Sequence, residues 1–140
     1  MINLIIKWQK WEIEFQGEKI SMELLPLKVG TNLLLTPFFI RIEEQDNKGK
    51  ALGIGKKDVT VDQDKLSQYI IESTRLETEL QNVCRDIFPS HVRDIQGMTI
   101  NGKPVDPIIL CEEPIFSTLV LQIVTQLYKI SRITAEQAKN

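Results

Sequence analysis

The residue best suited to acid–base chemistry is the single histidine of the chain, His91. Imidazole titrates near neutral pH, so a histidine held beside a carboxylate can serve as a general base. Asp94 lies three positions further on, but no Gly-x-Ser-x-Gly turn marks a nucleophile for a catalytic triad. His91 also follows Pro89, and a position just after a helix-ending proline is typical of a surface or capping residue. We therefore predict no catalytic residue, and the alternative is a small enzyme that uses His91 with a carboxylate.

The two cysteines, Cys84 and Cys111, are candidates for metal or redox chemistry. Neither belongs to a Cys-x-x-Cys pair and no second histidine is present, whereas a structural zinc ion needs four ligands. Both fall within apolar helical patterns, where a free thiol packs as a small hydrophobic side chain. A disulfide between them would be unusual in a reducing compartment. We predict neither a metal site nor a cofactor.

Two further patterns resemble functional sites only in part. The carboxylate pairs Glu43-Glu44 and Glu112-Glu113 could indicate a hydrolase or a magnesium site, but adjacent residues on a strand face opposite ways, and the second pair suits a helix start. The segment Gly49–Lys57 contains the glycines and lysines of a phosphate loop. Its spacing is wrong, however, and Lys57 stands where a serine or threonine would bind magnesium. We interpret it as a basic loop that could meet an acidic protein surface.

Large apolar side chains are the stronger candidates for binding, because aromatic residues supply much of the energy of protein interfaces. Trp8 is the best of these candidates, whereas Trp11 is better explained by packing inside a hairpin. The predicted interaction residues are Trp8, Trp11, Phe15, Tyr69, Phe116, Leu127 and Tyr128.

The first third of the chain is predicted to be rich in β-structure. Apolar and polar residues alternate over 11–15 and again over 20–24, and Gly17 between them suits a tight turn. This pattern predicts a β-hairpin with one apolar face, which ends at Pro26 because proline lacks a backbone donor.

The next part of the chain gives weaker signals. Apolar residues alternate over 37–42, which predicts a further strand or extended segment, while residues 27–36 show no clear period and are left unassigned. Glycines and lysines dominate residues 45–57, which predicts a mobile loop.

The second half of the chain changes to a helical period. Hydrophobic residues recur at spacings of three and four over 66–88, which predicts a long amphipathic helix capped by Asp62 or Asp64 and ended by Pro89. Asn101-Gly102 then predicts a tight turn between two short apolar arms.

The last predicted helix begins near Glu112 and continues to about Ile130. It is apolar around most of its circumference, so we expect it to be buried on several sides, within the domain or by another subunit.

Together these elements predict an α+β protein, with an N-terminal β-hairpin or small antiparallel sheet followed by a long amphipathic helix and a buried C-terminal helix. The chain has 140 residues, of which 42% are hydrophobic, and this is typical of a single domain. Within residues 1–140 we assign a β-rich part (1–44), a flexible loop (45–61), a helical part (62–133) and a tail (134–140).

The charge balance argues against several classes of partner. Seventeen Lys and Arg residues against 19 Asp and Glu residues give a formal net charge of −2, without the basic excess of a nucleic-acid-binding protein. The longest strongly apolar stretch, around 115–121, is far shorter than the roughly 20 residues of a membrane-spanning helix. Residues 1–7 do not look like a secretory signal. We expect a cytoplasmic protein that binds neither nucleic acid nor membrane.

The order of these elements, with the sequence of the last third, resembles the tail assembly chaperones of long-tailed bacteriophages and prophages. The resemblance lies in the turn at 101–105, in Glu-Pro-Ile-Phe at 113–116 where the apolar helix opens, and in the final residues 131–140. The rest of the chain is similar only in its pattern of elements.

This resemblance implies a non-enzymatic protein of the infected bacterial cytoplasm, which coats the tape measure protein and helps tail-tube subunits polymerise around it. Such a protein has no catalytic residues, and a homo-oligomer is compatible with this role. The predicted β-rich third is longer than a mainly helical chaperone would need. A structural protein of the virion, in the tail, neck or baseplate, is therefore the alternative.

Overall fold

The structure is a computed structural model, of which we describe residues 1 and 6–139, with side chains as far as residue 132. The N-terminal segment 1–7 and the predicted tail 134–140 thus lie partly outside the described residues. The described chain forms, in order, β1 (Gln9–Phe15), β2 (Glu18–Leu24), α1 (Val29–Ala51), α2 (Gln63–His91), β3 (Val92–Gln96), β4 (Thr99–Ile100), β5 (Lys103–Pro104), α3 (Pro107–Glu112), a 3₁₀ turn η1 (Pro114–Phe116) and α4 (Ser117–Lys139). This order confirms the α+β prediction.

A small antiparallel sheet with strand order β1-β2-β3 forms the N-terminal part. The predicted hairpin is confirmed, and Trp11 pairs with Met22 across it. Its turn consists of Gln16 and Gly17, whose φ angles of 51° and 80° are both positive, as the twist of a two-residue hairpin requires. The third strand, β3, was not predicted. It pairs with β2 through an irregular register, and Asp94 within it has a left-handed φ of 53°.

Helix α1 overturns the prediction of a strand at 37–42 and of a loop beginning at 45. The helix begins at Val29, passes through Pro37 and ends at Ala51. Its inner side packs on α4, where the rings of Phe39 and Tyr128 lie 4.7 Å apart. Alternating apolar residues fit a strand locally, but burial against another helix decides the conformation here. The β-rich part therefore ends at Leu24, not at residue 44.

Helix α2 is the long amphipathic helix predicted from the sequence. The carboxylate of Asp62 accepts hydrogen bonds from the amides of Asp64 and Lys65, at 2.9 and 3.3 Å, and so caps the helix start. Pro89 does not end it, because α2 continues to His91. The predicted tight turn at Asn101-Gly102 is confirmed between β4 and β5.

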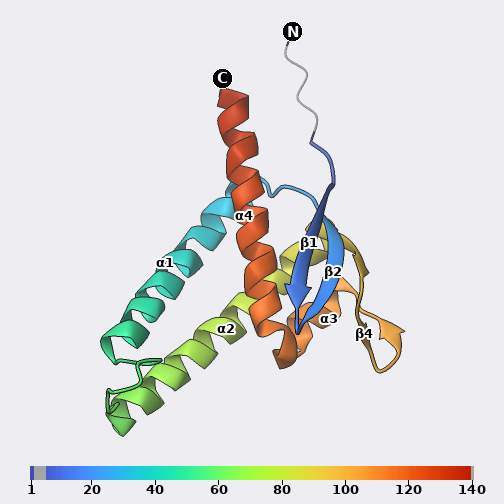
Figure 1. Ribbon diagram of the computed structural model, residues 1–140. Coiled ribbons are helices and arrows are strands. Elements are labelled where there is room, and N and C mark those ends of the chain that lie inside the picture. Colours follow the sequence, from blue (N-terminus) through green and yellow to red (C-terminus); the bar gives the residue numbers. More distant parts are fainter. Residues whose placement is uncertain (2–5, 140) are drawn as a thin grey trace.

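Helix α4 is the centre of the core and stands between the sheet and α1, with α2 crossing behind it (Figure 1). A broad face of α4 is fully buried, and each fully buried aliphatic side chain contributes about 2 kcal/mol. The residues of this face are Leu119, Val120, Ile123, Val124 and Leu127. They meet Phe88 of α2, Leu110 of α3 and the inner face of β2 in one hydrophobic cluster.

One buried hydroxyl ties the end of the sheet to α4. The Oγ atom of Ser131 accepts a hydrogen bond of 2.6 Å from the amide of Leu27, which lies between β2 and α1, and it donates to the carbonyl of Leu127. Ser131 is 3% exposed, so water cannot replace this partner. The hydroxyl fixes where the chain enters α1.

We expect Ser131→Ala to lower the free energy of unfolding by about 2 kcal/mol, because it leaves the buried amide of Leu27 without an acceptor. Urea denaturation measures this loss. Thr125→Ala is the matched control, since its hydroxyl makes the same kind of bond to the carbonyl of Leu121 on the exposed side of α4. Equal losses in the two variants would show that the Leu27 bond contributes nothing.

Candidate functional site

The most unusual surface of the molecule is the outward side of the first half of α1. Its side chains recur at helical spacing, and Leu33, Leu34 and Ile40 are 68%, 69% and 53% exposed. We call this surface the α1 outer face. Its members are Val29, Leu33, Leu34, Pro37 and Ile40.

The opposite side of the same helical segment is also apolar. Leu35 is fully buried, and Phe38 and Phe39 pack against the core. No residue from Val29 to Ile40 carries a charge. The polar residues of this segment are the uncharged Thr31, Asn32 and Thr36, so most of its circumference is apolar, as in a buried helix. The α1 outer face therefore has the composition of a covered surface.

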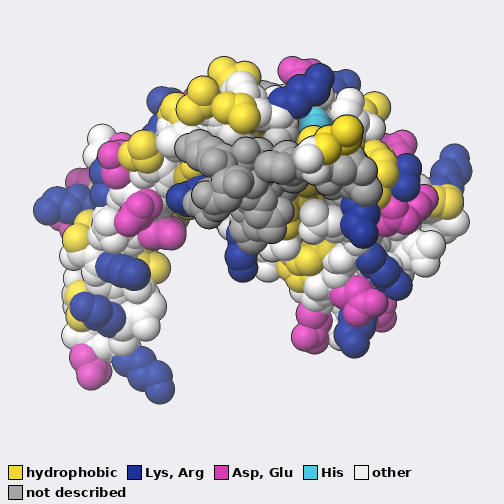
Figure 2. Space-filling model, turned by 90° about the horizontal axis from the view of Figure 1, so that it is seen from above, with side chains coloured by type: hydrophobic (Ala, Val, Ile, Leu, Met, Phe, Trp, Pro, Cys, Tyr) yellow, Lys and Arg dark blue, Asp and Glu magenta, His cyan; other side chains and the backbone are white. Residues whose placement is uncertain are grey.

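The C-terminal end of α1 and the N-terminal end of α2 form an arm that stands apart from the rest of the molecule. Figure 2 shows this arm on the left, rich in Lys and Arg side chains, with a hollow between it and the larger body. At the tip the carbonyl oxygens of α1 accept backbone hydrogen bonds from Leu52, Gly53 and Ile54. Residues 45–51 of the predicted loop are thus the last turns of α1, and the turn itself follows Ala51.

A groove of about 330 Å³ lies where α1, α2 and α4 meet. Its aliphatic lining consists of Ile42 from α1, Leu76 and Leu80 from α2 and Leu121 from α4. Polar side chains also line it, from α1 and α2 and, with Ser117 and Thr118, from α4. We call it the three-helix groove.

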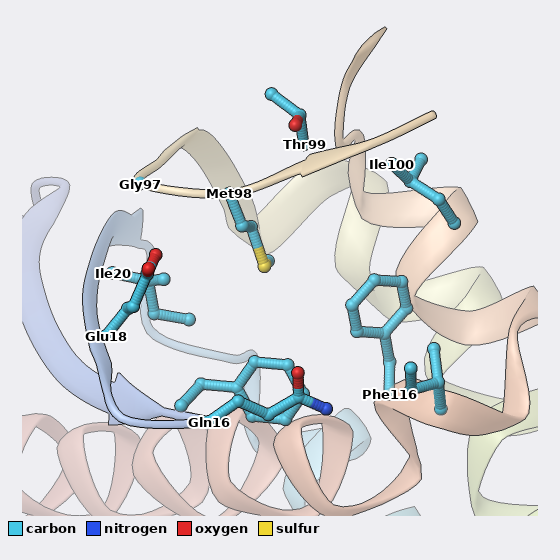
Figure 3. Close-up of a pocket in the computed structure, with 10 residues that line it drawn as sticks. Gln16, Glu18, Ile20, Gly97, Met98, Thr99, Ile100 and Phe116 are labelled. Atoms are coloured by element: carbon cyan, nitrogen blue, oxygen red, sulfur yellow. The ribbon is translucent and has the colours of Figure 1, made fainter. Parts of the chain in front are cut away.

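A separate pocket of about 650 Å³, which we call the second hollow, is bordered by the β1–β2 turn, by the segment before β4 and by η1. Figure 3 shows Met98 and Phe116 directed into it and Thr99 directed away. Among the described residues that line it, Glu18 is the one that carries a charge. This arrangement offers apolar contact and no pair of groups that could perform acid–base chemistry.

Several predicted interaction residues gather near the sheet. The guanidinium of Arg93 lies 4.1 Å from the ring of Trp8 and also bonds to Glu23 on β2, so Trp8 is held as a half-buried side chain. Trp11 packs against the core. The rings of Phe15 and Phe116 lie 6.0 Å apart and line the second hollow.

The other predicted interaction residues lie among the helices. Tyr69 lines the three-helix groove. Tyr128 is half-buried against Phe39, and its hydroxyl lies 3.4 Å from Oγ1 of Thr36. Leu127 is fully buried in the core, so a partner cannot reach it in the folded protein.

His91 joins the end of α2 to the sheet. Its Nδ1 atom lies 3.0 Å from the carbonyl oxygen of Leu25, and the amide of Leu25 donates to the carbonyl of His91 at 2.9 Å. These paired bonds give the imidazole a structural part in the fold.

The two cysteines lie side by side in the core, where α2 meets α3. Burial raises the pKa of the Cys84 thiol far above its usual range, and Cys111 raises it further. Burial also raises the pKa of Cys111 to about 12, although Arg85 lowers it. A nucleophilic cysteine needs a lowered pKa, so neither thiol is suited to catalysis.

The raised pKa values of the two thiols predict that the protein becomes less stable in alkaline solution. Well below pH 9 the folded and the unfolded chain both keep their thiol protons, so the contribution of the thiols to stability is constant. As the pH rises through 9, the unfolded chain, with thiol pKa values near 9.0, releases protons that the folded chain retains. The unfolded state is then favoured, and the two thiols together lower the free energy of unfolding by about 2.5 kcal/mol between pH 8 and 10. Urea denaturation across this range measures the loss.

The control for this prediction is the variant Cys84→Ala/Cys111→Ala, in which the other titrating groups are unchanged. Between pH 8 and 10 its free energy of unfolding should fall less than that of the wild type, and the difference should equal the loss attributed above to the two thiols. Should the double variant not fold, each single variant should remove about half of the dependence. Identical pH profiles in all variants would contradict the assignment.

The remaining candidates for chemistry are dispersed. Arg85 pairs with Glu112 at 2.8 Å, and Glu43 and Glu44 lie exposed on α1. Within the described residues no group of three or more His, Cys, Asp and Glu side chains is arranged to hold a metal ion. The described helices also include none with the length and hydrophobicity needed to cross a membrane.

No protein-family model, curated protein or solved structure matches this chain.

The α1 outer face was missed by the reasoning from sequence. Its signal was present, since the run from Val29 to Ile40 has no charge. The run was divided between an unassigned segment and a predicted strand, so its helical spacing could not be recognised. The three-helix groove had no local signal, because its residues come from three distant helices.

Proposed function

We propose that this protein is a non-enzymatic chaperone of phage tail assembly, which binds the tape measure protein in the cytoplasm of the infected bacterium and recruits tail-tube subunits to it. The single observation that carries the proposal is the exposed, uncharged α1 outer face. It supports a protein that works by covering apolar surface of another chain.

The physical requirement of such a task fits this surface. A long, largely helical protein exposes apolar side chains until tube subunits enclose it. An apolar stripe of helical spacing can pack against a helix of that kind and dissociate again, since no covalent step is involved. The bonds of His91 to Leu25 support a structural role for that histidine, which makes the alternative of an enzyme less favourable.

The test of the proposal is co-expression with the tape measure protein encoded by the same phage or prophage. We expect a soluble complex that remains together through size-exclusion chromatography, whereas the tape measure protein alone aggregates. A tape measure protein that stays insoluble, and that does not copurify with this chain, would refute the proposal.

A structural role in the virion remains the alternative, and a second measurement separates the two. A chaperone leaves the tail before assembly is complete, whereas a tail, neck or baseplate protein remains in it. Mass spectrometry of purified phage particles should therefore detect tail-tube protein but not this chain. Its presence in stoichiometric amount would favour the virion component.

A further inference from the structure

The three-helix groove has a preformed wall. The side-chain amide of Gln45 on α1 donates to the carbonyl oxygen of Tyr69 at 3.0 Å and to Oγ of Ser73 at 2.8 Å, both on α2. These bonds hold the two helices together at the groove and engage the polar side chains of Gln45 and Ser73 in its wall. Leu76 and Leu80 offer a ligand aliphatic contact in this lining, and at 7% and 4% exposure they are the recessed part of it.

The charges at the rim of the groove all have one sign. Asp46 of α1 and Glu77 of α2 line it, and its described lining includes neither a lysine nor an arginine. Neither carboxylate has an ion pair or a side-chain hydrogen bond among the described residues. Of the cations near the groove, Arg41 pairs with Glu79 at 2.7 Å and Lys48 with Glu72 at 3.3 Å, and Arg75 lies outside the groove lining.

We infer that the three-helix groove binds an amphipathic helix in which aliphatic anchors lie within one turn of lysine or arginine residues. The anchors contact the recessed aliphatic lining, and the cations meet Asp46 and Glu77 at the rim. This inference rests on the proposed function in taking the helix to be a segment of the tape measure protein. It adds the charge of that segment, which the uncharged α1 outer face does not specify.

The experiment uses two synthetic helical peptides that share leucines at positions i, i+3, i+4 and i+7. One carries lysines beside the leucines, and the other carries glutamates at the same positions. We expect the full-length protein to bind the lysine peptide about tenfold more tightly, and high salt to reduce this preference. Amide NMR shifts caused by the lysine peptide should map to the residues that line the groove.

Charge-neutralising variants locate the effect. Asp46→Asn/Glu77→Gln should bring the two peptides to within about twofold of each other. The matched control, Glu44→Gln/Asp86→Asn, removes the same charge from the same two helices away from the groove lining and should keep the tenfold preference.

Equal binding of both peptides, or NMR shifts confined to another surface, would overturn the inference. So would an equal loss of preference in both double variants. The peptides test the groove without the tape measure protein, so the two proposals can fail separately. A tape measure complex that forms without any preference for the lysine peptide would remove this inference alone.

Discussion

Replacing Gly97 by alanine is expected to lower the free energy of unfolding by about 3 kcal/mol and the melting temperature by about 10 °C. Gly97 follows β3 with a left-handed φ of 95°. A Cβ atom there would lie 2.6 Å from the carbonyl oxygen of Lys19 and 3.1 Å from Cα of Ile20. Both are backbone atoms of β2, so the clash cannot be relieved by a change of rotamer. Thermal and urea denaturation measure the loss.

Gly102→Ala is the control for this prediction. Gly102 also has a positive φ, of 76°, but beyond its two chain neighbours no atom of the described residues lies within 4 Å of the position of an added Cβ. Only backbone strain remains, so we expect a loss of about 1 kcal/mol. If the two alanine variants were equally stable, the close approach of Gly97 to β2 would be without energetic consequence.

The fold was predicted where a local pattern and tertiary packing agree. The β1–β2 hairpin follows from strict alternation and a turn glycine, and α2 follows from its helical period and the cap at Asp62. β3 was not predictable in this way, because the left-handed Asp94 and the shifted register interrupt its alternation.

The segment 37–42 shows why local pattern can mislead. Phe38 and Ile42 are four residues apart, so they share a face in a strand and also in a helix. Phe39 decides between the two, because its ring packs on Tyr128 of α4, a contact between residues far apart in sequence. The candidate surfaces depend on the same long-range packing, and so they could be assigned only from the structure.

The second prediction concerns the α1 outer face. We expect Leu33→Asp/Ile40→Asp to weaken capture of the tape measure protein about 100-fold, because binding would remove two carboxylates from water without a partner. Both side chains are exposed, so the variant should unfold with nearly the wild-type free energy. Affinity is measured by titration of an immobilised tape measure segment.

The control variant is Ile70→Asp/Ile71→Asp on α2. These isoleucines are 53% and 58% exposed, which is close to the exposure of the α1 pair, and they lie outside the α1 outer face. We expect this variant to bind the tape measure segment within about threefold of the wild type. An equal loss in both variants would assign binding to general surface hydrophobicity.

The most direct measurement is hydroxyl-radical footprinting of this protein, free and in complex with the tape measure protein, read residue by residue by mass spectrometry. If the α1 outer face is where the partner docks, oxidation of Leu33, Leu34 and Ile40 should fall severalfold in the complex, while oxidation of Ile70 and Ile71 stays unchanged. Undiminished oxidation of all three α1 side chains in a verified complex would contradict the account.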